Sequence, residues 1–179
     1  MSTSISNTEI KINQQAFVDE LLNDYKLMCL SREASLLGRK EVLTGKAKFG
    51  IFGDGKELPQ IVMAKFFLNG DIRSGYYRDQ TFMMAIGNLT VNQFFAGLYA
   101  HTNIEKEPTS AGRQMGGHFS TKFINEDGKW LDLANQKNST SDISPTAAQM
   151  PRLVGLGLAS KMYRNNKELS HLTNFSKNG

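Results

Sequence analysis

The chain has 179 residues, a formal charge of +4 and 40% hydrophobic residues, as expected for one globular domain or part of a larger one. Its basic residues are spread along the sequence, so we expect no nucleic-acid partner, whereas a phosphate-bearing small molecule fits the charge. The single cysteine, Cys29, excludes an intramolecular disulfide and a thiolate metal site. No apolar run could cross a bilayer, and residues 1–12 are polar and unlike a secretory signal. We therefore expect a flexible N-terminus, no membrane partner and a cytoplasmic protein.

A long amphipathic helix is predicted to begin at Gln14 and to end near Gly45, with Asn13 available as its cap. Apolar residues recur there at helical spacing, and we interpret them as packing residues: Phe17, Leu21, Tyr25 and Met28. A second helix is predicted from Glu57 to Leu68. The preceding Gly53-Asp54-Gly55 resembles the start of the magnesium and diphosphate motif of thiamine enzymes. No Asn-Asn pair follows at the required distance, so we interpret these residues as the leading turn of the second helix.

Arg78 is a candidate phosphate-binding residue. A short strand over Ser74 to Asp79, followed by a helix over Gln80 to Ile86, would place its guanidinium beside the free N–H groups of a helix start. The alternative is a structural contact of Arg78 with Asp79 or with the backbone. A further helix is predicted after Thr90, its N-cap.

The stretch Ser110 to Phe119 has the composition of a binding loop. Its glycines let the backbone pass close to a ligand, and a fixed cation, an amide and a group that titrates near neutral pH lie among them: Arg113, Gln114 and His118. The alternative is a surface loop whose histidine is solvated. The surrounding residues, 103–144, lack periodicity, and we expect isolated aromatic and apolar side chains to hold this long segment on the surface of the domain.

The last predicted helix covers Ala147 to Met162. Its glycines lie on one side and its leucine and valine residues on the other, which predicts close packing against another element. Ser144 to Thr146 would lie where this helix begins, next to free N–H groups. No closing element is predicted in residues 169–179, so the chain is expected to be the first part of a longer protein.

Three motifs resemble the alpha-subunit part of thiamine-diphosphate-dependent 2-oxoacid dehydrogenases in their order and spacing. They are Tyr76-Tyr77-Arg78-Asp79, then Gly112-Arg113-Gln114-Met115 through His118, then Ser144-Pro145-Thr146 followed by Gln149-Met150-Pro151. The similarity runs from about Leu30 to the C-terminus. Gly-Arg-Gln-Met resembles the branched-chain type more than the pyruvate type, and bacterial chains with fused alpha and beta parts are also similar. The resemblance implies a helix-rich α/β thiamine-diphosphate-binding fold over residues 13–179, with a long ordered loop and an incomplete parallel sheet, continuing beyond the chain.

The resemblance also implies an activity and a set of site residues. The reaction is attack of the thiamine ylid on the 2-oxo carbon, loss of carbon dioxide, and transfer of the acyl group to a lipoyl group. Tyr77 and Arg78 would contact the diphosphate, and His118 would lie beside the reacting centre. The other implied positions are Ser144 and Thr146 at the aminopyrimidine, and Phe49, Met115 and Gln114 in the substrate pocket.

The implied cofactors are thiamine diphosphate and magnesium, with the magnesium ligands expected beyond Gly179. We therefore expect this length of chain not to bind cofactor tightly or to turn over alone. The implied partners are a beta-type subunit or domain and a lipoyl-bearing acyltransferase, in a homodimer or an αβ heterotetramer. Relatives often have Leu-Ala-Thr where this chain has Thr146-Ala147-Ala148, so a monovalent cation is not assigned. The alternatives are a pyruvate or acetoin dehydrogenase, or a non-catalytic binding or assembly module with the same fold.

Overall fold

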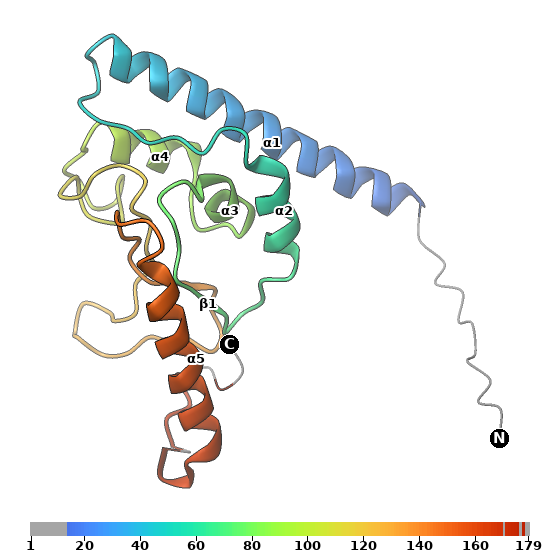
Figure 1. Ribbon diagram of the computed structural model, residues 1–179, viewed down its shortest axis with the longest axis vertical. Helices are drawn as coiled ribbons and strands as arrows, with labels where there is room; N and C mark the ends of the chain where they lie inside the picture. The colour runs from blue at the N-terminus through green and yellow to red at the C-terminus, as the bar shows by residue number, and fades with distance from the viewer. Residues whose placement is uncertain (1–13, 170, 176, 178–179) are drawn as a thin grey trace.

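A computed structural model describes residues 14–169, 171–175 and 177. These residues form a mainly helical structure (Figure 1). The predicted N-terminal segment and the Asn13 cap lie outside the described residues. The helices and strands are α1 (Gln14–Leu43), α2 (Glu57–Lys65), β1 (Ile72–Arg73), α3 (Gln80–Ala85), α4 (Val91–Leu98), β2 (Asn138–Ser139), α5 (Gln149–Asn165) and the 3₁₀-helix η1 (Lys167–Leu169). In this part of the chain no helix has both the length and the apolar character that crossing a membrane requires.

The buried face of α1 differs from the predicted one. Phe17, Leu21 and Tyr25 are half or more exposed, and the buried residues lie on another face of the helix: Ser31, Ala34, Ser35, Gly38 and Glu41. Most of these side chains are small, so α1 can approach its neighbours closely. The prediction was wrong because helical spacing identified an apolar stripe but not the stripe that packs against the other elements of this chain.

Helix α3 lies at the centre of the helical body and contacts both α1 and α2. Its Phe82, Met83 and Met84 belong to the apolar core, which also includes residues of the neighbouring elements: Ala34, Ala64, Ile86, Leu89, Phe94 and Phe119. Polar side chains join the same elements, since the Gln80 amide donates hydrogen bonds to the Ser31 carbonyl and to Ser35 Oγ. The helix predicted after Thr90 is confirmed, with Thr90 and Gln93 forming a reciprocal capping box at the start of α4.

The sheet is small and parallel. β1 pairs with β2 in the register Ile72 with Asn138 and Arg73 with Ser139. The strand predicted over Ser74 to Asp79 is wrong in position, because β1 ends at Arg73 and the following residues turn into α3. Asp79 N–H donates to the Tyr76 carbonyl at 3.0 Å, which closes this turn. The helix-rich architecture with a two-stranded parallel sheet agrees with the predicted α/β class.

Helix α5 extends away from the helical body (Figure 1). It was expected to pack closely, but it contains no buried residue, and a Cβ added at Gly155 or Gly157 would meet no atom of the described residues within 4 Å. Its first residue is Gln149, so Ser144 and Thr146 precede the helix by several residues instead of forming its first turn. The expectation of close packing is therefore not met within the described part of the chain.

Gly53 is predicted to be required for the position of the turn that carries Arg78. A Cβ on Gly53 would overlap the Arg78 carbonyl oxygen, which is backbone and cannot move aside alone. Gly53→Ala should therefore lower the free energy of unfolding by about 1–3 kcal/mol, as overpacking does. Urea unfolding followed by circular dichroism measures this change.

Gly155→Ala is the matched control, because its added methyl group meets open space within an exposed helix. It should raise the stability by up to about 1 kcal/mol through helix propensity. Equal destabilisation by both substitutions would contradict the close approach at Gly53.

Candidate functional site

The Tyr76–Arg78 turn brings two tyrosine rings together. The Tyr76 and Tyr77 hydroxyl oxygens are 2.7 Å apart, and the ring centroids are 4.0 Å apart. The hydrogen bond with Tyr77 raises the pKa of the Tyr76 phenol, while a side-chain hydrogen bond with Thr146 acts in the opposite direction. The turn and the segment before α5 therefore meet at the Tyr76 hydroxyl.

His118 also lies beside Tyr77. Its ring stacks on the Tyr77 ring with a centroid distance of 6.3 Å, and its Nε2 lies 2.7 Å from Ser144 Oγ. His118 Nδ1 lies 3.1 Å from the Met115 carbonyl oxygen, which can only accept, so Nδ1 carries the hydrogen in this arrangement. With the hydrogen on Nδ1 alone, Nε2 accepts the hydrogen bond of the Ser144 hydroxyl. His118 is buried, which excludes the alternative of a solvated loop histidine.

Arg78 has an incompletely satisfied guanidinium. Its Cζ lies 5.7 Å from the centroid of the Tyr77 ring, while Nε is buried and has no hydrogen-bond partner among the described residues. The backbone at Arg78 is fixed by Gln60, whose Nε2 donates to the Arg78 carbonyl at 3.1 Å. Buried polar atoms are nearly always paired, so this nitrogen is a natural donor to a ligand.

The predicted substrate-pocket residues gather at a different place. Phe49, Gln114 and Met115 line a cavity of about 150 Å³ together with residues at the end of α4. Phe49 and Met115 are both about half exposed. The Met115 carbonyl oxygen lies 3.1 Å from His118 Nδ1, so this cavity adjoins the Tyr77 cluster through Met115.

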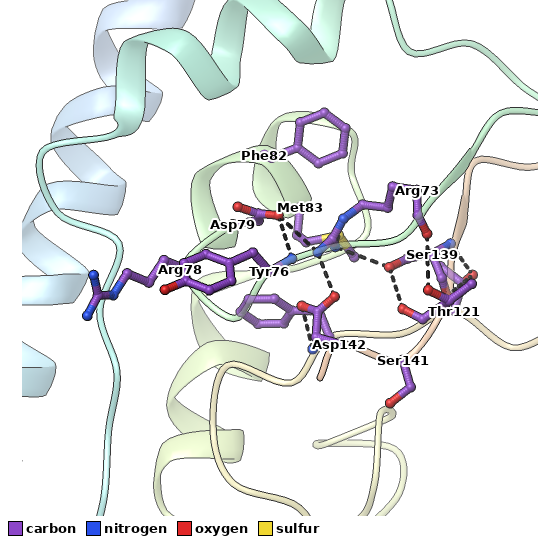
Figure 2. A network of polar contacts seen from close by, with 12 residues as sticks. Arg73, Tyr76, Arg78, Asp79, Phe82, Met83, Thr121, Ser139, Ser141 and Asp142 are labelled. Carbon is purple, nitrogen blue, oxygen red and sulfur yellow. Dashed lines mark hydrogen bonds and ion pairs between the residues drawn. The ribbon is translucent and has the colours of Figure 1, made fainter. Parts of the chain in front are cut away.

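A buried ionic cluster lies beside the Tyr76–Arg78 turn (Figure 2). Arg73 Nη2 lies 2.7 Å from Asp142 Oδ1 and 3.2 Å from Asp79 Oδ2. Arg73 Nη1 donates to Ser139 Oγ at 3.1 Å. The Arg78 side chain points away from this cluster, so the two arginines have separate surroundings (Figure 2).

Asp142 has the most perturbed environment of this cluster. Burial raises the pKa of its carboxyl to about 7; the charge of Asp79 adds to the rise, while the charges of Arg73 and Arg152 and a hydrogen bond from Phe119 N–H oppose it. One cation faces two carboxylates here, and desolvation disfavours the second negative charge. Asp142 is thus a buried acid that changes its charge near neutral pH.

The comparisons with known proteins agree with the motifs. No model of a known protein family matches the chain. The chain is 31% identical over 149 residues to the 2-oxoisovalerate dehydrogenase subunit alpha of Bacillus subtilis (strain 168). The chain is therefore similar to the alpha subunit of a 2-oxoisovalerate dehydrogenase over most of its own length. The match covers 80% of this chain and spans 38% of the length of that relative.

This alpha-subunit-like chain brings most of its predicted site residues together. Tyr77 contacts Arg78 and His118, and His118 contacts Ser144. Thr146 joins the same group through Tyr76. The roles assigned to these residues from the resemblance remain predictions, as do those of the three residues in the separate cavity.

Sequence reasoning missed Arg73 and Asp142. The two residues are 69 positions apart, and each has one isoleucine beside it among polar residues, so neither shows a clear local sign of burial. Asp79 was considered only as a partner of Arg78, whereas it pairs with Arg73. The only available signal was a charged residue, Arg73, at the end of a short strand. Such a residue does not show which carboxylate will pair with it.

The stability of the protein is predicted to depend on the protonation of Asp142. The folded-state pKa of about 7 is above the ordinary value of 3.8, so the folded protein holds a proton in this window that the unfolded chain has released. The free energy of unfolding should therefore lose about 2 kcal/mol from this group as the pH rises from about 5.5 to about 8. Asp142→Asn should remove this loss, which urea unfolding at the two pH values measures.

The difference in unfolding free energy between the wild type and Asp142→Asn isolates the contribution of Asp142, because the other ionisable groups are present in both proteins. Glu57 and Glu107 have lowered pKa values and contribute stability that is lost only at more acidic pH. Parallel pH profiles for the wild type and Asp142→Asn would show that Asp142 is not protonated near neutral pH.

Proposed function

We propose that the chain supplies the alpha-type part of a dehydrogenase that oxidatively decarboxylates a branched-chain 2-oxoacid with thiamine diphosphate. The observation that carries this proposal is the buried, unpartnered Nε of Arg78 beside the Tyr77, His118 and Ser144 cluster. A guanidinium with a free buried donor suits an anionic group such as a diphosphate. The motifs and the similarity to the 2-oxoisovalerate dehydrogenase subunit alpha support the same function.

The residues present fit the cofactor at both of its ends. Arg78 would hold the diphosphate by charge-assisted hydrogen bonds, with Tyr77 beside it, and the segment containing Ser144 and Thr146 would face the aminopyrimidine. Bound thiamine diphosphate supplies the electron sink that decarboxylation of a 2-oxoacid needs.

His118 is placed to act on the substrate. Its Nε2 faces Ser144 Oγ, and the Met115 carbonyl fixes the hydrogen on Nδ1. A histidine held in one tautomer can donate to or accept from a substrate carboxylate at a defined atom. The Tyr77 ring on one face limits the access of water to this imidazole.

The metal ion and the partner proteins of the proposed site come from outside the cluster of Tyr77, Arg78, His118 and Ser144. No group of three His, Cys, Asp or Glu side chains in the described residues could hold a metal ion. In this proposal, magnesium and a beta-type subunit or domain complete the cofactor site, and a lipoyl-bearing acyltransferase accepts the acyl group. A homodimer or an αβ heterotetramer in the cytoplasm would be the working assembly.

Substrate choice is assigned to the apolar cavity at Phe49 and Met115. Its volume of about 150 Å³ suits a short aliphatic side chain, with Gln114 as a polar group at its edge. The second candidate function is pyruvate or acetoin dehydrogenation by the same site. A non-catalytic module of the same fold would lack cofactor binding altogether.

Arg78→Ala should weaken the binding of thiamine diphosphate with magnesium by at least about tenfold, because a desolvated charge-assisted contact is worth more than about 1.4 kcal/mol. Calorimetric titration of the protein assembled with its beta-type partner measures the affinity. Arg39→Ala is the control, since the exposed Arg39 forms an ion pair with Asp54 and contacts none of the site residues named above. Equal affinities of the wild type and Arg78→Ala would remove Arg78 from the site.

His118→Ala should lower the rate of decarboxylation by about 100-fold or more while leaving cofactor affinity nearly unchanged. A ferricyanide-linked assay with 3-methyl-2-oxobutanoate and pyruvate in parallel measures the rate and identifies the substrate class. Loss of cofactor binding together with the rate would make His118 a structural residue. A folded wild-type assembly that binds no cofactor would favour the non-catalytic module.

A further inference from the structure

The two segments of the candidate site meet at one buried guanidinium. Arg73 is 8% exposed and Asp142 is 3% exposed, and their closest atoms are 2.7 Å apart. The same nitrogen, Nη2, also contacts Asp79 Oδ2 at 3.2 Å. None of these three residues is needed for the contacts assigned to the cofactor or the substrate. The burial of the ionisable Arg73 and Asp142 side chains therefore calls for a separate explanation.

Each carboxylate in the cluster holds a backbone N–H next to a site side chain. Asp79 Oδ2 accepts from Tyr76 N–H at 2.9 Å, immediately before Tyr77. Asp142 Oδ2 accepts from Phe119 N–H at 3.3 Å, immediately after His118. The path from Tyr77 to His118 through the cluster thus consists of one guanidinium, two carboxyl groups and two backbone N–H groups.

We propose that Arg73 is the positioning residue of the candidate site, and that through Asp79 and Asp142 it holds Tyr77 and His118 in their stacked arrangement. The inference deepens the proposed function and rests on it only for the effect on cofactor binding. Arg73 touches neither ring, so its action is indirect.

The surroundings of Arg73 are shaped to hold a guanidinium in one orientation. Nη1 donates to Ser139 Oγ at 3.1 Å and contacts Met83 Sδ at 2.7 Å, and Cζ lies 5.8 Å from the centroid of the Phe82 ring. The chain passes over the guanidinium at Gly75, where any Cβ would overlap it. A planar fork can bind partners in several directions, which a lysine ammonium at the same place could not reproduce.

The other charge facing this cluster comes from α5. Arg152 Nη1 donates to the Ser141 carbonyl oxygen at 2.5 Å and to Thr140 Oγ1 at 3.1 Å. Arg152 lowers the pKa of Asp142 by its charge, while its hydrogen bonds go to Ser141 and Thr140. Arg73 is therefore the cation that bridges the two site segments.

The test is the tautomer of the His118 imidazole, observed by long-range ¹H–¹⁵N NMR of the protein. Wild type should show the Nδ1–H form for His118, assigned by comparison with His118→Gln among the three histidines. Arg73→Met should convert this signal to a mixture of tautomers, because the His118 loop loses its connection to the turn. Arg32→Met is the control, since it breaks an arginine–carboxylate pair with Glu57 that includes no residue of the cluster.

Arg73→Lys and Asp142→Asn test the same connection with smaller changes in case Arg73→Met does not fold. Both should give partial mixing of the tautomers with unchanged helix content by circular dichroism. A lower melting temperature with an unchanged His118 signal in any folded Arg73 variant would mean a purely structural role and would overturn the proposal. A wild-type His118 without a dominant Nδ1–H form would overturn it as well.

Measuring cofactor affinity as well separates the proposed dehydrogenase function from the proposed positioning role of Arg73. In the assembled protein, Arg73→Met should weaken thiamine diphosphate binding at least about tenfold relative to Arg32→Met. A wild-type protein that binds no thiamine diphosphate would contradict the proposed function. The NMR signal of the His118 tautomer would still test the positioning role of Arg73. Equal affinities of the two variants, with binding intact, would contradict the role of Arg73 in positioning the cofactor side of the site.

Discussion

A guanidinium can be buried at low cost only if the surrounding protein replaces the water it has lost, and this requirement organises the region around Arg73. Two carboxylates, a serine hydroxyl and a methionine sulfur do so here, and they come from separate segments of the chain. Because every partner must reach one group, β1, β2, α3 and the turn before it are held in a single relative arrangement. The candidate site lies beside these elements, and the hydrogen bonds of Asp79 and Asp142 to Tyr76 N–H and Phe119 N–H connect it to them.

The helices around the site are also joined by polar contacts. Ser31 Oγ and Thr81 Oγ1 are 2.6 Å apart between α1 and α3, and the Gln60 side chain binds both the Arg78 carbonyl and Phe82 N–H. Such bonds have directional requirements that apolar packing lacks, so they define the register between elements. The Arg78 backbone is consequently fixed from α2 while its guanidinium nitrogen remains available.

Local signals in the sequence predicted where the helices lie better than they predicted which residues of the helices make contacts. Thr90 was identified as a cap because capping depends on residues three positions apart, and the motifs around Arg78, His118 and Ser144 indicated the residues that the fold brings together. The face of α1 and the packing of α5 were predicted wrongly, since periodicity shows that a helix has an apolar side but not what covers it. The pairing of Arg73 with Asp142 depends on tertiary structure, and no pattern within either segment contains it.

The separation of these partners along the chain has a consequence for biosynthesis. Asp142 leaves the ribosome 69 residues after Arg73, whereas Asp79 follows after only six. The helical contacts among α1, α2 and α3 are available early, while contacts over such long separations close slowly. Asp79 is therefore the partner that Arg73 can meet first, and Asp142 completes the cluster only once β2 has paired with β1.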